Sequence, residues 1–205
     1  MDLEPGLIPS QQEGAQSETV SSKDCIDKNN CDHLFEVVRQ RLFNVNNWHD
    51  YAGKLTADFQ LTDTNGTEVN RLIDKGDHFR INIPAPGSQA GEGYDWVKVE
   101  EITEGEDQGN KFAVIRVRPA SDPCNDNSDV AHFFSEQATS SFVVKQEGNK
   151  LIAAVYGRNE KPNTDVEKLL DKTRNALIAT GAISGFSKLQ WKSLVEGLLD
   201  VKEKS

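Results

Sequence analysis

The sequence contains no run of 18 apolar residues, which is the length that a membrane-spanning helix requires. It also lacks an excess of positive charge, because 23 lysines and arginines stand against 33 acidic residues, for a net charge of −10. Proteins that bind nucleic acids neutralise phosphates with lysine and arginine, so this balance argues against that class. We therefore expect neither a membrane span nor a nucleic-acid partner.

Cysteine is scarce, with only Cys25, Cys31 and Cys124 in the chain. The first two do not have Cys-x-x-Cys spacing, and no second pair is present to complete a zinc site. An odd number of cysteines also fits poorly with a secreted disulfide framework. We expect three free thiols and no bound metal. The acidic start of the chain is unlike a signal peptide, so we expect a cytoplasmic protein.

Signatures of catalysis and of cofactor binding are missing as well. The four histidines do not form a His-Glu-x-x-His motif, and the chain has neither a Gly-x-Ser-x-Gly motif nor a P-loop. Gly91 and Gly93 lack the third glycine of a dinucleotide-binding motif. An enzyme would need groups such as His49, His132 and Asp95 to meet in one pocket. We expect no cofactor and favour a non-enzymatic function.

One loop has the spacing of a calcium site. Asn125, Asn127, Asp129 and Glu136 fall at positions 1, 3, 5 and 12 of such a loop. Position 6 is Val130 instead of the glycine that the sharp turn needs. We therefore interpret the segment as a cluster of polar turns.

Residues 1–31 differ from the rest of the chain. They contain no aromatic residue, and six acidic residues stand against two lysines. Such a segment buries too little surface to offset the entropy lost on ordering. We predict a disordered acidic tail over residues 1–31 and a single domain over residues 32–205.

Hydrophobic spacing predicts the elements of that domain. Apolar residues recur at helical intervals between Asp32 and Val45. Alternation then predicts strands near 55–61, 67–73, 79–83, 94–102, 112–117, 142–145 and 151–156. Residues 112–117 are apolar on both faces, so we place them at the centre of the sheet.

The C-terminal part predicts two helices. A capping box begins the first helix at Thr164, and Gly181 and Gly185 end it. A second capping box begins the last helix at Ser187. One N-terminal helix, six or seven mostly antiparallel strands and two C-terminal helices predict an α+β fold, whose sheet is either barrel-like or strongly curved.

The glycine- and proline-rich segment from Pro84 to Trp96 is the main candidate binding site. Tyr94 and Trp96 lie two residues apart at its end and so share one face of a strand. Large amphipathic rings on an exposed face commonly form a binding surface. The alternative is that these rings cover the hydrophobic core.

Three arginines on the predicted strands, Arg80, Arg116 and Arg118, extend this candidate site. Guanidinium groups that share a face can clamp a carboxylate or a phosphate. In a chain with an excess of acidic residues, internal ion pairs are the alternative.

Two partial resemblances carry expectations about the fold. The segments Gly76–Ile81 and Tyr94–Val99 resemble part of an SH3-like small barrel, in which a Gly-Asp turn opens one strand and an aromatic pair opens a later one. The element order, with its tryptophan-containing last helix, is similar to helix-grip (START-like) domains. In those domains a curved sheet grips a long C-terminal helix around an apolar cavity. This chain departs from them because no strand is predicted before the first helix and glycines interrupt the last one.

We predict a soluble, non-enzymatic binding or protein-interaction domain whose site includes Tyr94, Trp96, Arg80, Arg116 and Arg118. The alternative is a helix-grip domain that holds an apolar small molecule in a cavity between the sheet and the C-terminal helices. The partner is then either a protein or a small apolar ligand.

Overall fold

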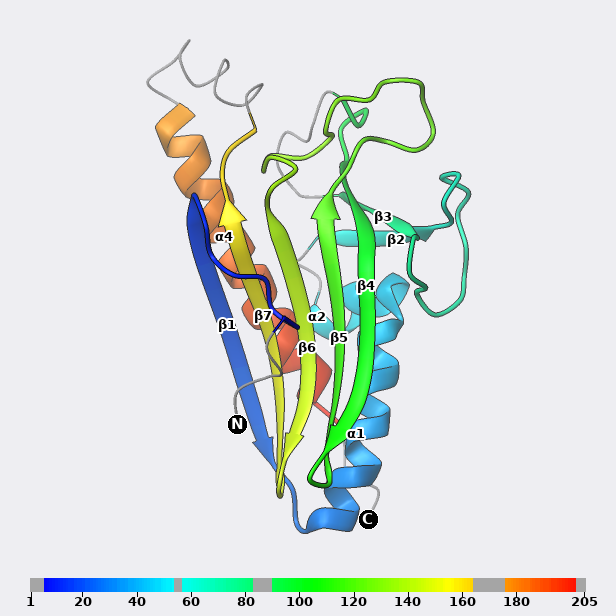
Figure 1. The fold of residues 1–205 in the computed structure, drawn as a ribbon, viewed down its shortest axis with the longest axis vertical. Helices are drawn as coiled ribbons and strands as arrows, with labels where there is room; N and C mark the ends of the chain where they lie inside the picture. The colour runs from blue at the N-terminus through cyan, green and yellow to red at the C-terminus, as the bar shows by residue number, and fades with distance from the viewer. Residues whose placement is uncertain (1–5, 54–56, 83–89, 164–175, 202–205) are drawn as a thin grey trace.

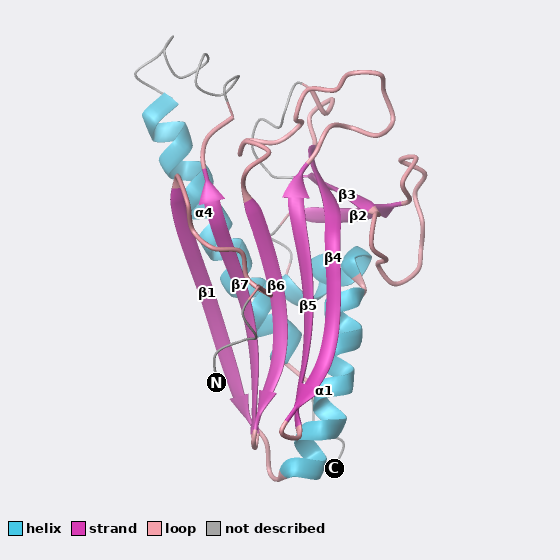
Figure 2. Ribbon diagram, in the orientation of Figure 1, coloured by secondary structure: helices cyan, strands magenta, loops and turns pink. Residues whose placement is uncertain are grey.

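The computed structural model describes residues 6–53, 57–82, 90–163 and 176–201, and of residues 176–187 it describes only the backbone. These residues form one antiparallel sheet of seven strands with two long helices on one of its faces (Figures 1 and 2). The predicted α+β class and strand number are therefore confirmed. The sheet is open and has two edge strands, β1 and β2. The expected barrel-like sheet and the SH3-like resemblance are therefore not confirmed.

The elements follow one another along the chain as β1 (Ala15–Asp24), α1 (Lys28–Phe43), a 3-10 turn (Val45–Asn47), α2 (Trp48–Ala52), β2 (Asp58–Thr62), β3 (His78–Asn82), β4 (Asp95–Asp107), β5 (Asn110–Pro119), β6 (Thr139–Glu147), β7 (Lys150–Glu160) and α4 (Ala176–Leu199). The strand order across the sheet is β1-β7-β6-β5-β4-β3-β2. Strand β5 is therefore central, as its apolar character on both faces predicts.

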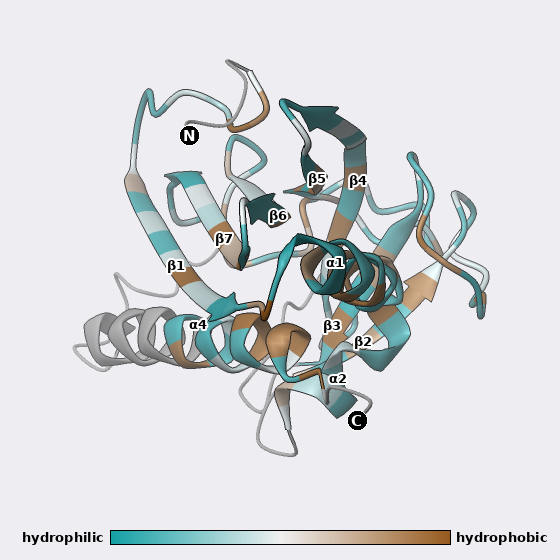
Figure 3. Cartoon of the chain, turned by 90° about the horizontal axis from the view of Figure 1, so that it is seen from below, coloured by the Kyte–Doolittle hydropathy of each residue, from teal (hydrophilic) through white to brown (hydrophobic). Residues whose placement is uncertain are grey.

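We call the face that carries α1 and α4 the inner face and the opposite one the outer face; Figure 3 shows both helices on the same side of the sheet. The centre of the inner face is filled by aromatic rings. The ring of Trp48 lies 5.3 Å from Phe59, 5.8 Å from Phe79 and 4.7 Å from Phe142, measured between centroids. Trp191 of α4 lies 5.2 Å from Phe142 and closes this cluster.

Strand β1 overturns the prediction of a disordered tail. Residues 15–24 pair with β7 along their whole length, and α1 begins four residues later. Composition does not reveal this strand, because an edge strand is held mainly by backbone hydrogen bonds and does not need apolar side chains. On the inner face β1 presents Ser17, Thr19, Ser21 and Lys23, a row with no hydrophobic alternation to detect.

The C-terminal helix is also different from the prediction. Helix α4 runs without a break through Gly181 and Gly185, so the described residues contain one C-terminal helix there instead of two. Helix propensity is a weak preference that packing overrides. Gln190, expected in a capping box, instead accepts a hydrogen bond from the backbone N–H of Ala57 at 3.0 Å. The capping box predicted at Thr164 lies outside the described residues.

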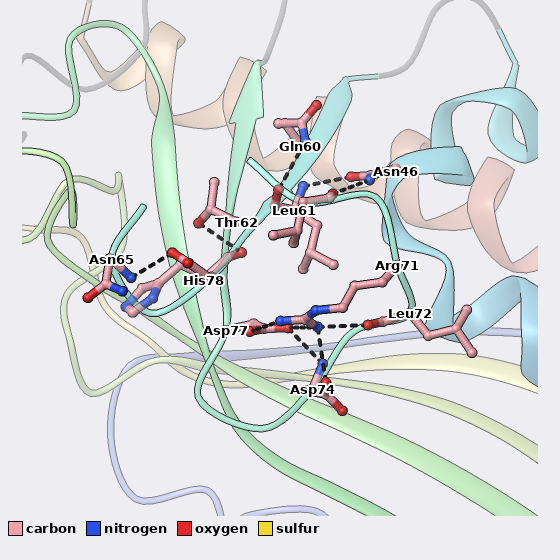
Figure 4. A network of polar contacts seen from close by, with 12 residues as sticks. Asn46, Gln60, Leu61, Thr62, Asn65, Arg71, Leu72, Asp74, Asp77 and His78 are labelled. Atoms are coloured by element: carbon pink, nitrogen blue, oxygen red, sulfur yellow. Dashed lines mark hydrogen bonds and ion pairs between the residues drawn. The ribbon is translucent and has the colours of Figure 1, made fainter. Parts of the chain in front are cut away.

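The connection between β2 and β3 is a structured loop where a strand over residues 67–73 was expected. Strand β2 pairs with β3, and the segment forms a single bridge between Glu68 and Thr62. Arg71 holds the loop by donating to both carboxylate oxygens of Asp77, at 2.6 and 2.8 Å (Figure 4). Asn46 accepts from Leu61 N–H at 2.7 Å, which satisfies part of the edge of β2.

The expectation of three free thiols is wrong for two of them. Cys25 and Cys31 form a disulfide, whereas Cys124 is free and exposed. The tight turn from β1 into α1 brings the two Cα atoms to 5.2 Å, a proximity that the sequence spacing does not reveal. Because disulfides persist mainly in oxidising compartments, the cysteines no longer support a cytoplasmic location, which stays a prediction.

Removing this disulfide should destabilise the fold. In the variant Cys25→Ser/Cys31→Ser we expect the free energy of unfolding to fall by about 2 kcal/mol, because the cross-link restricts the unfolded chain over a short loop. Urea denaturation of this variant and of Cys124→Ser measures the difference. An equal effect of the Cys124→Ser control would contradict the expectation.

Candidate functional site

The five residues predicted from the sequence lie on or beside the outer face of β3, β4 and β5. Arg80 stands opposite Trp96, and Arg118 stands opposite Lys98, which is two residues further along β4. Arg116 follows on the same face of β5 as Arg118. The structure therefore brings these residues to one face, although that face is opposite to the helices.

The two aromatic residues have different surroundings. Trp96 is only 2% exposed, and its backbone N–H donates to Ala131 O at 2.7 Å, so loop residues cover it. Tyr94 is partly exposed, and the guanidinium of Arg80 lies 4.8 Å from its ring centroid. Arg80 also forms an ion pair with Glu68 at 2.5 Å. Of the two aromatic residues, Tyr94 is therefore the one that contributes to the surface, where it stacks with Arg80.

The remaining two arginines are engaged in ion pairs, which was the alternative interpretation. Arg118 Nε lies 2.5 Å from Glu100. Arg116 pairs with Glu101, and its Nε lies 3.4 Å from Glu100. These contacts join β4 to β5 across the outer face.

The groups considered for catalysis serve different local roles. His49 Nδ1 lies 3.1 Å from Asp58. His132 Nδ1 accepts from the backbone N–H of Phe134 at 2.9 Å in the loop before β6. Asp95 is 2% exposed on β4. These contacts tie each histidine to its own neighbourhood.

The Asn/Asp-rich loop consists of turns, as interpreted from the sequence. Asn125 and Asn127 each accept from the backbone N–H two residues later, both at 2.9 Å. Side-chain oxygens that bond to the backbone in this way form Asx turns. Among the described residues, no three His, Cys, Asp or Glu side chains gather as metal ligands would.

The inner face offers a second candidate site, which the sequence did not single out. One row of paired residues crosses five neighbouring strands there and contains only small side chains: Val99, Val117, Ser140, Gly157 and Ser17. The next row toward α1 is bulkier and includes Phe142. Aromatic side chains therefore line the centre of the inner face, and small side chains line it near the end of β7.

A carboxyl group lies over this row. The residue before it, Asn159, has a positive φ of 55°, and the pairing of β1 with β7 shifts register at this point. A bulge of this kind redirects the following side chain. Ser17 Oγ accordingly donates to Glu160 Oε1 at 2.6 Å, which places the carboxyl on the inner face.

Gly157 makes room for that carboxyl. A Cβ atom at this position would lie 1.9 Å from Glu160 Oε1 and 2.4 Å from Ser17 Oγ. Burial raises the pKa of Glu160, and the hydrogen bond from Ser17 and the charges of Arg158 and Lys188 only partly oppose this effect. Helix α4, to which Lys188 belongs, packs against β1 and β7, so the carboxyl is on the side of the sheet that this helix covers.

The bulge is fixed by the N-terminal strap, which we define as residues Gly6–Gly14. The strap crosses the outer face in front of β7 (Figure 1). Asn159 Oδ1 accepts from the backbone N–H groups of Gln12 and Glu13 at 2.7 and 3.2 Å, and its own N–H donates to Gln11 at 2.9 Å. The strap also packs Leu7 and Ile8 against a small apolar cluster formed by Val114, Val143 and Ala154.

We expect Asn159→Ala to lower the free energy of unfolding by about 2 kcal/mol, because it removes the two hydrogen bonds that Asn159 Oδ1 accepts and puts a Cβ-bearing residue without a polar side chain at a positive φ. Asn159→Gly should lose less, since glycine adopts this φ at little cost. Urea denaturation of both variants separates the two contributions. Equal losses would contradict the backbone part of the argument.

The sequence contained a partial signal for this site. Gly157 interrupts a strand of alternating residues, and a glycine in a strand often marks a bulge or a close approach. Ser17 was missed because the segment around it was interpreted as disordered. Glu160 was missed because a carboxylate at a strand end is ordinarily solvated, and only the bulge turns it inward.

In the described part of the chain no helix is both long and apolar enough to cross a bilayer. No family model matches the chain, and no curated protein matches it. Among solved structures, a hypothetical protein of Helicobacter pylori is similar over 94% of this chain and 89% of its own, with 12% sequence identity and a TM-score of 0.50.

Two further structures are similar at lower scores. A protein of Mycobacterium smegmatis matches with 13% identity over 92% of this chain and 93% of its own, with a TM-score of 0.42. Norcoclaurine synthase of Thalictrum flavum, in complex with dopamine and hydroxybenzaldehyde, matches with 7% identity over 93% and 90%, with a TM-score of 0.40. The likeness to the Helicobacter pylori protein shows a shared fold, and the strand before α1 together with the unbroken α4 gives this chain the helix-grip arrangement that its element order suggested.

Proposed function

We propose that this protein binds a small, largely apolar molecule between the inner face of the sheet and helix α4. This was the alternative interpretation of the sequence, and the helix-grip arrangement favours it. The observation that carries it is Glu160, a half-buried carboxyl group that is turned onto the inner face beside a row of small side chains. Small-molecule sites are typically apolar surfaces with few polar groups, each in a fixed position.

The local construction supports a site that is formed before a ligand arrives. The strap holds Asn159, Asn159 forms the bulge, and the bulge sets the direction of Glu160. Strained backbone and bulges occur frequently beside functional groups. Ser17 and Gly157 then determine where the carboxyl lies.

Native mass spectrometry of the protein purified from its own host, beside the denatured mass, tests the proposal. We expect a surplus mass that disappears on denaturation. In Ser140→Trp a large ring occupies the small-residue row, so the surplus mass should be lost while the protein stays folded. If the row is already fully packed, the ring will instead cost about 1–3 kcal/mol or more of stability and no surplus mass will be found in the wild type.

The matched control is Ser22→Trp, which places the same ring on the exposed outer side of β1. This variant should retain both the surplus mass and the melting temperature of the wild type. Loss of the surplus mass in both variants would contradict a site on the inner face.

The outer-face residues Tyr94 and Arg80 stay a prediction for contact with a protein partner. Their support is the stacked pair that they form at the surface. A pull-down with Tyr94→Ala that retains every partner of the wild type would remove this prediction.

A further inference from the structure

We propose that Glu160 is the polar anchor of the inner-face site and binds the protonated amine of an otherwise apolar ligand. This inference rests on the proposed function and names the chemical class of the ligand. It follows from three features of the carboxyl group: the lack of a counter-ion among the described residues, its fixed position and its partly desolvated surroundings.

The carboxyl group has no ion-pair partner in the part of the chain that the structure describes. Its one hydrogen bond there is the one that Ser17 Oγ donates to Oε1 at 2.6 Å. Among the described residues, the charges that lower the pKa of Glu160 are those of Arg158 and Lys188. Oxygen Oε2 is therefore able to accept a further donor.

Arg158 is engaged elsewhere. Its Nη2 donates to Glu18 at 2.6 Å, and its Nη1 donates to Gly157 O at 2.9 Å and to Ser17 O at 3.3 Å. Lys188 is exposed to solvent on α4. Within the described residues, Glu18 on the outer face therefore has an ion-pair partner, whereas Glu160 on the inner face has none.

The position of the carboxyl is determined by its neighbours. The positive φ of Asn159 turns the side chain inward, and Gly157 provides the space that Oε1 occupies. A carboxyl fixed in this way loses little freedom on binding, which favours recognition of one particular group.

Partial burial decides which group is recognised. An ionised carboxylate away from water is unfavourable unless a cation or several donors compensate it. A neutral hydroxyl supplies one hydrogen-bond donor and no charge. A protonated amine supplies a donor and a positive charge, so it forms a charge-assisted hydrogen bond with the carboxylate. A ligand carboxylate would be repelled. An amine should therefore bind most tightly, an alcohol less tightly and a carboxylic acid most weakly.

Isothermal titration of the whole protein at pH 7.5 with n-octylamine, n-octanol and octanoate tests this order. We expect the wild type to bind octylamine about tenfold or more tighter than octanol, and octanoate more weakly than both. In Glu160→Gln, which keeps the size and one acceptor, octylamine and octanol should bind equally. In Gly157→Ala, where the Cβ displaces the carboxyl, the preference should shrink.

Glu18→Gln is the matched control, because it is the same substitution in the neighbouring strand on the opposite face. It should keep the full preference for octylamine. Equal binding of amine and alcohol by the wild type, or an unchanged preference in Glu160→Gln, would overturn the role of Glu160 and leave the proposed function standing. If none of the three compounds binds, the proposed function fails together with this inference.

Discussion

Gly197→Ala is expected to lower the free energy of unfolding by about 3 kcal/mol, although alanine is the better helix former. A Cβ atom at this position of α4 would lie 2.0 Å from the backbone oxygen of Tyr51 and 2.5 Å from its carbonyl carbon. A backbone group cannot rotate away as a side chain does, so α2 and α4 must separate. Overpacking of this kind costs more than the roughly 1 kcal/mol of helix propensity that alanine contributes.

The separation would also disturb the end of α4. Arg41 of α1 donates to the carbonyl oxygens of Gly197, Leu198 and Asp200 at 2.9, 3.2 and 3.1 Å. These bonds satisfy carbonyl groups at the end of the helix that have no partner within it. A shift of α4 away from α2 would lengthen them, so the steric cost and the loss of this cap act together.

Urea denaturation of Gly197→Ala beside Ser193→Ala measures this effect. Ser193 lies one turn earlier on α4 and already has a Cβ atom, so alanine there gains helix propensity without adding an atom to the helix surface. The control should be as stable as the wild type or slightly more stable. If Gly197→Ala were as stable as Ser193→Ala, the close approach of α2 and α4 would not limit this position.

The sequence predicts those elements well in which one face is buried. The helical spacing of Leu34, Val38 and Leu42 identifies α1, and all three are buried against the sheet. Alternation identifies β4 to β7, and apolar residues on both faces correctly place β5 at the centre. In these elements the local pattern and the tertiary packing favour the same structure.

The prediction fails where long-range pairing decides the structure. Strand β1 has Val20, its most apolar residue, 57% exposed, so its formation depends on the backbone of β7 more than on its own composition. The disulfide between Cys25 and Cys31 depends on the turn that β1 makes possible. The inner-face site depends on the same strand, because Ser17 belongs to it. One missed edge strand therefore concealed both features.

Stability should fall as the pH is lowered from 7 to 5, and His132 should cause much of the loss. Burial lowers the pKa of His132 to about 3, whereas a histidine in the unfolded chain titrates near 6.5. Between these values the unfolded state binds a proton that the folded state does not, so unfolding is favoured as the pH falls. From pH 7 to pH 5 this difference amounts to about 2 kcal/mol.

The structure explains why His132 stays neutral. Its Nδ1 accepts a hydrogen bond from Phe134 N–H at 2.9 Å, and its ring stacks on Phe133 with centroids 4.5 Å apart. A protonated Nδ1 would lose this acceptor role inside an apolar site. Burial and Lys98 also lower the pKa of His78, which adds to the loss. The raised pKa of Glu160 has the opposite effect on stability as the pH falls, because the folded state then binds a proton more readily than the unfolded state.

Comparing wild type and His132→Asn by urea denaturation at pH 7, 6 and 5 isolates the contribution of His132. Asparagine keeps an acceptor near the position of Nδ1 but does not titrate. Between pH 7 and pH 5 the variant should therefore lose about 2 kcal/mol less of its free energy of unfolding than the wild type does. The variant will have a lower absolute stability because its side chain is smaller, but the slope with pH is the relevant quantity. Equal slopes in the two proteins would mean that His132 is protonated within the folded state, and that the loop before β6 opens to admit water.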